Sequence, residues 1–226
     1  MSQMNFKIIA KRYRYSIRFQ YIIFPFTSSE LMNALARTNL GYILSPPPKA
    51  GIPIGISLEA GGLIGKKGNT SIFFDSSLQV LAVEGLDYME TINVFSEIID
   101  IIKSTLVPDS DKKVIFYEII SNHNVEIGQS SMKILGKQRF EGGLNESISK
   151  ILGEEVSNYS IHMCSTSEKI DDPNWFDIQI QPFNRRPDVA FDVITVYRKS
   201  EKDMVDKFGK TLEDNLKKIF EFLSNA

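Results

Sequence analysis

The stretch Thr70-Ser-Ile-Phe-Phe-Asp-Ser-Ser-Leu-Gln-Val-Leu-Ala-Val-Glu84 predicts two short strands joined by a turn, because β-branched and aromatic residues fill both arms. Directly after it, Asp87-Tyr-Met-Glu90 has the spacing of a capping box at the start of a helix. Apolar residues at helical spacing continue to Leu106, and Pro108 ends the helix. A hairpin followed by a long helix is the unit from which the fold prediction starts.

The residues before this hairpin complete a larger unit. Ser16–Phe26 predicts a strand, and Thr27-Ser-Ser-Glu30 predicts the capped start of a short helix that ends near Asn39. Pro46-Pro47-Pro48 marks a connector before a further strand at Ile52–Leu58. The first half of the chain therefore has the predicted order strand, helix, three strands, helix.

The second half repeats this order. The expected elements are a strand, a short helix, three strands and a final long helix, at Val114–Ile120, Leu144–Leu152, Tyr159–Ser165, Trp175–Phe183, Ala190–Tyr197 and Met204–Leu223. We predict an α+β fold in which tandem β-α-β-β-β-α repeats form one curved antiparallel sheet with the long helices on one face. The expected divisions are a basic N-terminal segment (1–15), a first repeat (16–107), a linker (108–113) and a second repeat (114–226).

This order, together with the 70–84 hairpin and the helix that begins at Asp87, resembles the repeats of the TATA-binding-protein fold and the broader helix-grip group. The hairpin carries the resemblance at the level of residues, whereas the element order extends it over most of the chain. The resemblance implies a DNA-binding or transcription-related protein that binds through its sheet.

The composition excludes several classes of protein. The 226 residues include one cysteine, Cys164, and two histidines, so a disulfide framework, a zinc site and a Cys–His nucleophile are not expected. The glycine-rich stretch Gly61–Asn69 lacks the spacing of a phosphate-binding loop and predicts a flexible hairpin loop. No segment has the length of a membrane span or the pattern of a signal peptide. We expect a cytoplasmic, non-enzymatic protein with no cofactor and no metal.

Charge is unevenly distributed along the chain. The formal net charge is −2, yet residues 1–29 contain five basic and no acidic side chains. The run Lys11-Arg-Tyr-Arg-Tyr15 combines cations with aromatic rings, a combination that binds phosphates and stacks on bases. The predicted nucleic-acid contacts are Lys11, Arg12, Tyr13, Arg14, Tyr15, Arg18, Phe73, Lys66 and Lys67.

Two other functions remain open. In the first half, both faces of the strands at 19–26 and 78–83 read as apolar, which favours a protein–protein interface or a homodimer. The second half instead alternates Asp177, Gln179 and Gln181 with apolar residues, which predicts a polar outer face. The third function is binding of a small ligand in a cavity between the sheet and a long helix, lined by Trp175 or by Phe73 and Phe74.

The remaining polar candidates are the two histidines and the cysteine. His123 is expected in a polar turn, while His162 and Cys164 are two residues apart and should share one face of a strand.

Overall fold

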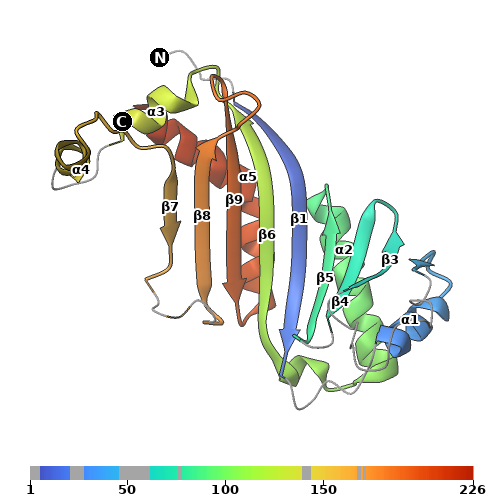
Figure 1. Cartoon of the computed structure of the whole chain (residues 1–226). Helices are drawn as coiled ribbons and strands as arrows, with labels where there is room; N and C mark the ends of the chain where they lie inside the picture. The colour runs from blue at the N-terminus through green and yellow to red at the C-terminus, as the bar shows by residue number, and fades with distance from the viewer. Residues whose placement is uncertain are drawn as a thin grey trace, which may run out of the picture.

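The computed structural model of the chain describes residues 6–20, 28–45, 62–75, 78–138, 144–166, 169 and 172–225. Within these residues the protein has one nine-stranded antiparallel sheet in the order β2-β3-β4-β5-β1-β6-β9-β8-β7 (Figure 1). The strands are β1 (Lys7–Phe19), β2 (Ile43–Leu44), β3 (Gly62–Lys67), β4 (Thr70–Asp75), β5 (Val80–Gly85), β6 (Val114–Glu126), β7 (Ile161–Cys164), β8 (Trp175–Pro182) and β9 (Ala190–Lys199). The α+β prediction with a single antiparallel sheet is confirmed.

Four of the five α-helices in the described residues are those that the sequence predicts. The five are α1 (Ser28–Ala36), α2 (Tyr88–Ile101), α3 (Ser131–Lys137), α4 (Leu144–Leu152) and α5 (Lys202–Asn225). The predicted cap of α2 is present, because the Asp87 carboxylate accepts a hydrogen bond of 2.7 Å from the backbone N–H of Glu90. A π-helical turn (Ile102–Leu106) and a 3-10 turn (Ser110–Lys113) then lead into β6. None of these helices is both long and apolar enough to cross a membrane.

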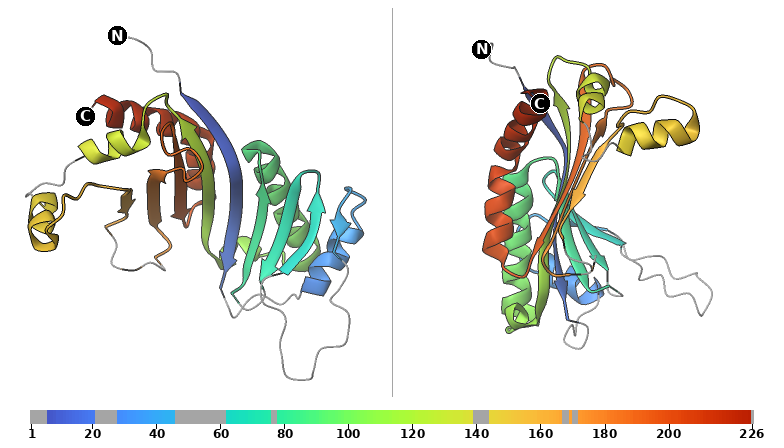
Figure 2. Two further views of the ribbon diagram at one scale, coloured as in Figure 1. Left: turned by 45° about the horizontal axis from the view of Figure 1, so that its top comes forward. Right: turned by 90° about the vertical axis from the view of Figure 1, so that its left-hand side faces the viewer.

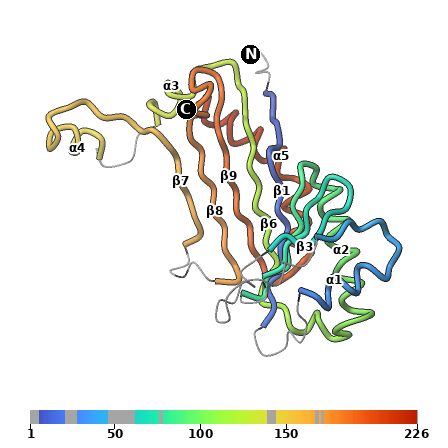
Figure 3. The backbone as a smooth tube through the Cα atoms, turned by 45° about the vertical axis from the view of Figure 1, so that its right-hand side comes forward, coloured from blue at the N-terminus to red at the C-terminus, as the bar shows by residue number. Residues whose placement is uncertain are grey.

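The two halves of the sheet meet where β1 pairs with β6. In each half the first strand lies beside the last, so that β1 neighbours β5 and β6 neighbours β9. The central register pairs Tyr13 with Ser121, Tyr15 with Ile119 and Ile17 with Tyr117. A sheet that continues through both halves follows from this pairing, and Figure 3 shows the strands running side by side across the seam.

Four local predictions differ from the structure. Residues 7–15 are not a separate basic segment but belong to β1, because their charged and aromatic residues alternate with the period of a strand. Residues 62–67 form β3 rather than a loop, so only Gly68 and Asn69 make the turn to β4. Strand β6 continues to Glu126, and α3 was not predicted. The strand predicted at 52–58 lies outside the described residues.

The core lies between one face of the sheet and the two long helices. In the right-hand view of Figure 2, α2 and α5 lie side by side on this face. Tyr15 of β1 packs on Phe95 of α2 with ring centroids 4.5 Å apart, and Phe191 of β9 packs on Phe220 of α5 at 4.8 Å. We call this side of the sheet the helix face and the opposite side the open face.

The two long helices approach each other closely at Gly209 of α5. The Tyr88 ring of α2 lies against this glycine, and its hydroxyl donates a hydrogen bond of 2.9 Å to the backbone carbonyl of Asp206. A methyl group on Gly209 would lie 2.4 Å from Tyr88 Cε2. Glycine at this position therefore allows the contact between the helices.

We expect Gly209→Ala to lower the free energy of unfolding by about 1–3 kcal/mol, because the added methyl overpacks the contact with Tyr88. Denaturant unfolding of both proteins measures this difference. Gly136→Ala is the matched control: it also lies in a helix, but the nearest atom to the added methyl is 3.8 Å away. Equal stabilities for the wild type and Gly209→Ala would contradict the proposed contact.

Candidate functional site

Three arginines of β1 lie on the open face of the sheet. Arg12, Arg14 and Arg18 alternate with Tyr13, Tyr15 and Ile17, which are buried on the helix face. We call Arg12, Arg14 and Arg18 the arginine stripe. Because β1 is the central strand, the stripe crosses the middle of the open face.

Two phenylalanine rings, one from β4 and one from β6, lie beneath guanidinium groups of the stripe. The Arg14 Cζ atom is 5.5 Å from the centre of the Phe73 ring on β4, and Arg18 Cζ is 5.9 Å from the Phe116 ring on β6. Arg198 of β9 approaches the same Phe116 ring at 4.3 Å. These distances lie in the range of attractive cation–π contacts, so the rings hold the guanidinium planes over the sheet.

Carboxylates neutralise part of this charge. Glu84 of β5 places an oxygen 3.9 Å from Arg12 Nε and 3.6 Å from Arg14 Nη1. Glu118 of β6 accepts hydrogen bonds from Arg198 at 2.6 and 2.8 Å and so holds that arginine tightly. Arg18, in contrast, has no ion-pair partner within the part of the chain that the structure describes. The arginine stripe therefore keeps an excess of positive charge at its Arg18 end.

The structure brings together five of the nine predicted contact residues and separates others. Phe73 and Lys66 lie on the open face with the three stripe arginines, as the pairing of β3, β4 and β5 shows. Lys11 is exposed at the irregularity between Ala10 and Arg12.

The predictions for Tyr13, Tyr15 and Lys67 are wrong. Both tyrosines are buried on the helix face, Tyr15 with no exposed surface, so neither ring can stack on a base. Lys67 also lies on the helix side, where it pairs with Glu97 of α2 and lies 4.9 Å from the Tyr42 ring. The alternation of a strand sends these residues to the face opposite the arginines.

The strand expected at 78–83 is apolar on both faces, as predicted, with Leu81 and Val83 buried on the helix face, but the open face around it is mixed. Val80 and Ala82 do lie on the open face, but their neighbours on β1 are Arg18 and Ser16. Ala82 is fully buried among longer side chains. The part of the expectation that concerned residues 21–26 falls outside the described residues.

In the second half, the predicted polar outer face is confirmed. Asp177, Gln179 and Gln181 of β8 lie opposite the buried Ile178 and Ile180. Asp192 of β9 pairs with Gln181 in the register and adds a further carboxylate. The open face therefore carries three arginines on β1, whereas β8 and β9 carry Asp177 and Asp192 beside the apolar Ile194 and Val196.

Several residues of the open face were missed by sequence reasoning. Phe116, Glu118 and Arg198 come together with the stripe only through the pairing of β1 with β6 and of β6 with β9. Their alternation with buried neighbours such as Tyr117 and Ile119 is visible in the sequence. Which strands lie beside one another is not, so the cluster could not be assembled from the sequence.

His123 lies inside the protein and not in a turn, which corrects the prediction for this residue. It belongs to β6, has no exposed surface, and lies between the sheet and α5. Its Nε2 atom is 2.9 Å from the Tyr13 hydroxyl, which donates to Glu213 at 3.2 Å. Because that hydroxyl has a single proton, both contacts are satisfied when His123 Nε2 carries a proton and donates. Burial lowers the pKa of His123 to about 4.

This pKa makes stability depend on pH. In the unfolded chain, histidine takes up a proton near pH 6.5, whereas folded His123 does so only near pH 4. Stability is therefore lost as the pH falls from 6.5 to about 4, by on the order of 3 kcal/mol in total. Denaturant unfolding of His123→Gln across this range should show a weaker pH dependence than unfolding of the wild type. If the wild type and His123→Gln lost the same stability over this pH range, His123 would not be the source of the pH dependence.

His162 and Cys164 share one face of β7, as predicted. His162 Nε2 is 2.9 Å from Asp177 Oδ2 on β8. Among the described residues, no group of three or more histidine, cysteine or acidic side chains is arranged to hold a metal ion. The His162–Asp177 pair is therefore a contact between the edge strand β7 and its neighbour β8.

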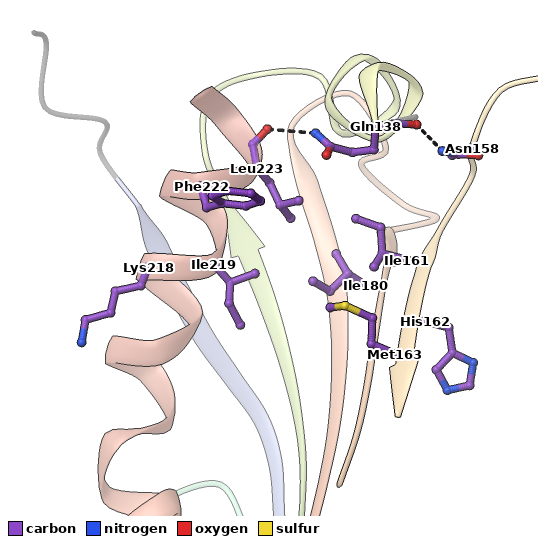
Figure 4. A pocket seen from close by; sticks show the side chains of 10 residues that line it. All are labelled: Gln138, Asn158, Ile161, His162, Met163, Ile180, Lys218, Ile219, Phe222 and Leu223. Carbon is purple, nitrogen blue, oxygen red and sulfur yellow. Dashed lines mark hydrogen bonds between the residues drawn. The ribbon is translucent and has the colours of Figure 1, made fainter. Parts of the chain in front are cut away.

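A cavity of about 510 Å³ lies between the C-terminal half of α5 and the edge strands β7 and β8 (Figure 4). Ile161, Met163 and Ile180 from the strands face Ile219, Phe222 and Leu223 from α5, and Gln138 and Asn158 close the upper end. The sequence predicted a cavity between the sheet and a long helix, but with a different lining. Phe74 is instead in the core, and Trp175 lies on the opposite face.

Comparison with protein-family models and with curated proteins gave no match to this chain.

Proposed function

We propose that the protein is a non-enzymatic nucleic-acid-binding protein that contacts a single strand along the arginine stripe. The observation that carries the proposal is the alignment of Arg12, Arg14 and Arg18 on the central strand, on the face of the sheet opposite to α2 and α5. Phosphates of one strand would follow this row, since arginine guanidinium groups bind phosphate oxygens with paired hydrogen bonds.

The aromatic rings of the same face support contacts with bases. Phe73 and Phe116 lie beneath the guanidinium groups of Arg14 and Arg18. Proteins that bind single strands commonly combine a basic groove with aromatic rings on which bases stack. Movement of Arg14 onto a phosphate would uncover the Phe73 ring for a base.

The charge distribution favours a single strand over a duplex saddle. The resemblance to the TATA-binding-protein fold implies a duplex held across both halves of the sheet. Asp177 and Asp192 lie on the second half of the open face, where they would repel phosphates. We therefore keep the nucleic-acid role that the resemblance implies, in the cytoplasm, and restrict the contact to the half around β1.

The alternative function is binding of a protein partner or a second copy to an apolar face of the sheet, and it has less support. Of the residues expected on that face, Val80 and Ala82 lie beside Arg18 and Ser16 of β1, so the described surface is mixed and not uniformly apolar. Glu84 and Glu118 also limit the affinity for nucleic acid, because a phosphate must compete with them for Arg12, Arg14 and Arg198.

The test uses a fluorescently labelled single-stranded oligonucleotide, as DNA and as RNA, in anisotropy titrations over a series of salt concentrations. Replacing Arg12, Arg14 and Arg18 together with alanine should weaken binding at least tenfold. It should also reduce the slope of log K against log salt by about 2, since each lost phosphate contact contributes about 0.7 for single strands.

The matched control removes the same charge from the other side of the molecule. Lys207, Lys210 and Lys217 lie on α5, and their replacement with alanine should leave binding close to wild type. A duplex of the same length should bind more weakly than the single strand. Absence of binding at low salt, or equal losses in both triple variants, would refute the proposal.

A further inference from the structure

Helix α4 projects from the body of the protein with its apolar residues exposed. Figures 1 and 3 show it beyond β7, away from the other helices. Leu144, Ile148, Ile151 and Leu152 have the spacing of a single helical face. None of the nine residues of α4 is buried, and Ile151 is 80% exposed. We call this helix, residues 144–152, the α4 arm.

Such a helix needs a surface to cover its apolar face. Isolated helices shorter than about 12 residues are marginal in water, because most helical stability in proteins comes from packing of the apolar face. The α4 arm, with nine residues, has no such packing within the described part of its own chain.

The cavity beside α5 is an apolar surface that is open to solvent. Its walls are apolar, and we call it the α5–β7 groove. Phe222 at its mouth is 70% exposed, and half of the Met163 surface is also open to solvent. The groove thus offers an apolar surface that no described segment of the chain covers (Figure 4).

The connections of the arm direct it away from its own groove. Asn158, which follows the arm, donates to the backbone carbonyl of Gln138, and Gln138 donates to that of Leu223 at 3.2 Å. Ser149 in the arm accepts from the backbone N–H of Val156 at 3.1 Å, so the connector is fastened to the helix. In the right-hand view of Figure 2, the arm and α5 lie on opposite sides of the sheet edge.

We propose that the α4 arm of one copy packs into the α5–β7 groove of a second copy, and that the second copy does the same in return. In this two-fold symmetric dimer the same contact between arm and groove forms twice, so both apolar surfaces of each chain are covered. The residues at i, i+4 and i+7 of the arm are the anchors by which an amphipathic helix occupies an apolar groove. Glu146 and Lys150 lie on the opposite, polar side of the arm, so its apolar face can enter the groove without burying a charge.

This dimer does not depend on the proposed nucleic-acid function. The arm and groove lie at the β7 edge of the sheet, whereas the arginine stripe is on the central strand. Failure of one proposal therefore leaves the other untouched.

The first experiment measures the mass of the full chain by sedimentation velocity, from about 1 to 100 µM. The wild type should dimerise as its concentration rises. Ile151→Asp in the arm and Phe222→Asp in the groove should each remain monomeric. Both side chains are largely exposed, so at concentrations where the wild type is monomeric the variants should have its circular dichroism spectrum and melting temperature. Leu86→Asp places the same charge at an exposed leucine away from both surfaces and should dimerise like the wild type.

The second experiment mixes the two monomeric variants. Ile151→Asp keeps an intact groove and Phe222→Asp keeps an intact arm, so their heterodimer retains one of the two contacts. The mixture should form dimers that neither variant forms alone.

Three results would overturn the proposal. A wild type that stays monomeric throughout the concentration range would exclude the exchange of arms. If that monomer bound an apolar dye and Phe222→Asp did not, the groove would be assigned to a small ligand. Dimers that persist in both variants would place the interface elsewhere. A mixture that remains monomeric would show that arm and groove do not meet.

Discussion

The pairing of β1 with β6 is the interaction on which the rest of the structure depends. Each strand has 13 residues and comes from a different half of the chain, so their ladder joins two similar units into one sheet. Because side chains alternate along a strand, this single register decides which residues of both halves meet the helices and which meet solvent. A slip by one residue would exchange the tyrosines and arginines of β1.

On the helix face, the register collects polar groups within an otherwise apolar core. Tyr13, His123 and Glu213 form one chain of contacts, and the Tyr15 hydroxyl donates to Asp206 at 2.5 Å. Burial raises the pKa of both tyrosines, so they remain neutral donors. These contacts link the central strands to α5, while Gly209 lets α5 approach α2. The seam between the halves is therefore joined by the helices as well as by the sheet.

On the open face, the same alternation produces a surface whose two halves differ in charge. Arginines of β1 lie over aromatic rings and share Glu84, whereas β8 and β9 contribute carboxylates and amides. A repeated topology has thus not produced a repeated surface. This asymmetry is the physical reason for assigning binding to one half of the face. The apolar arm and groove at the β7 edge form a separate surface with a different chemistry.

The sequence alone determined the fold class, the two long helices and the capped start of α2, because these depend on local periodicity and capping. It also identified Arg12, Arg14 and Arg18 as members of a basic run, although the strand was expected to begin only at Ser16. Only the tertiary structure decided that Tyr13 and Tyr15 are core residues, that His123 is buried, and that Phe116, Glu118 and Arg198 surround the stripe. Those facts depend on which strands pair and on which side the helices pack, and both are set by contacts between residues far apart in the chain.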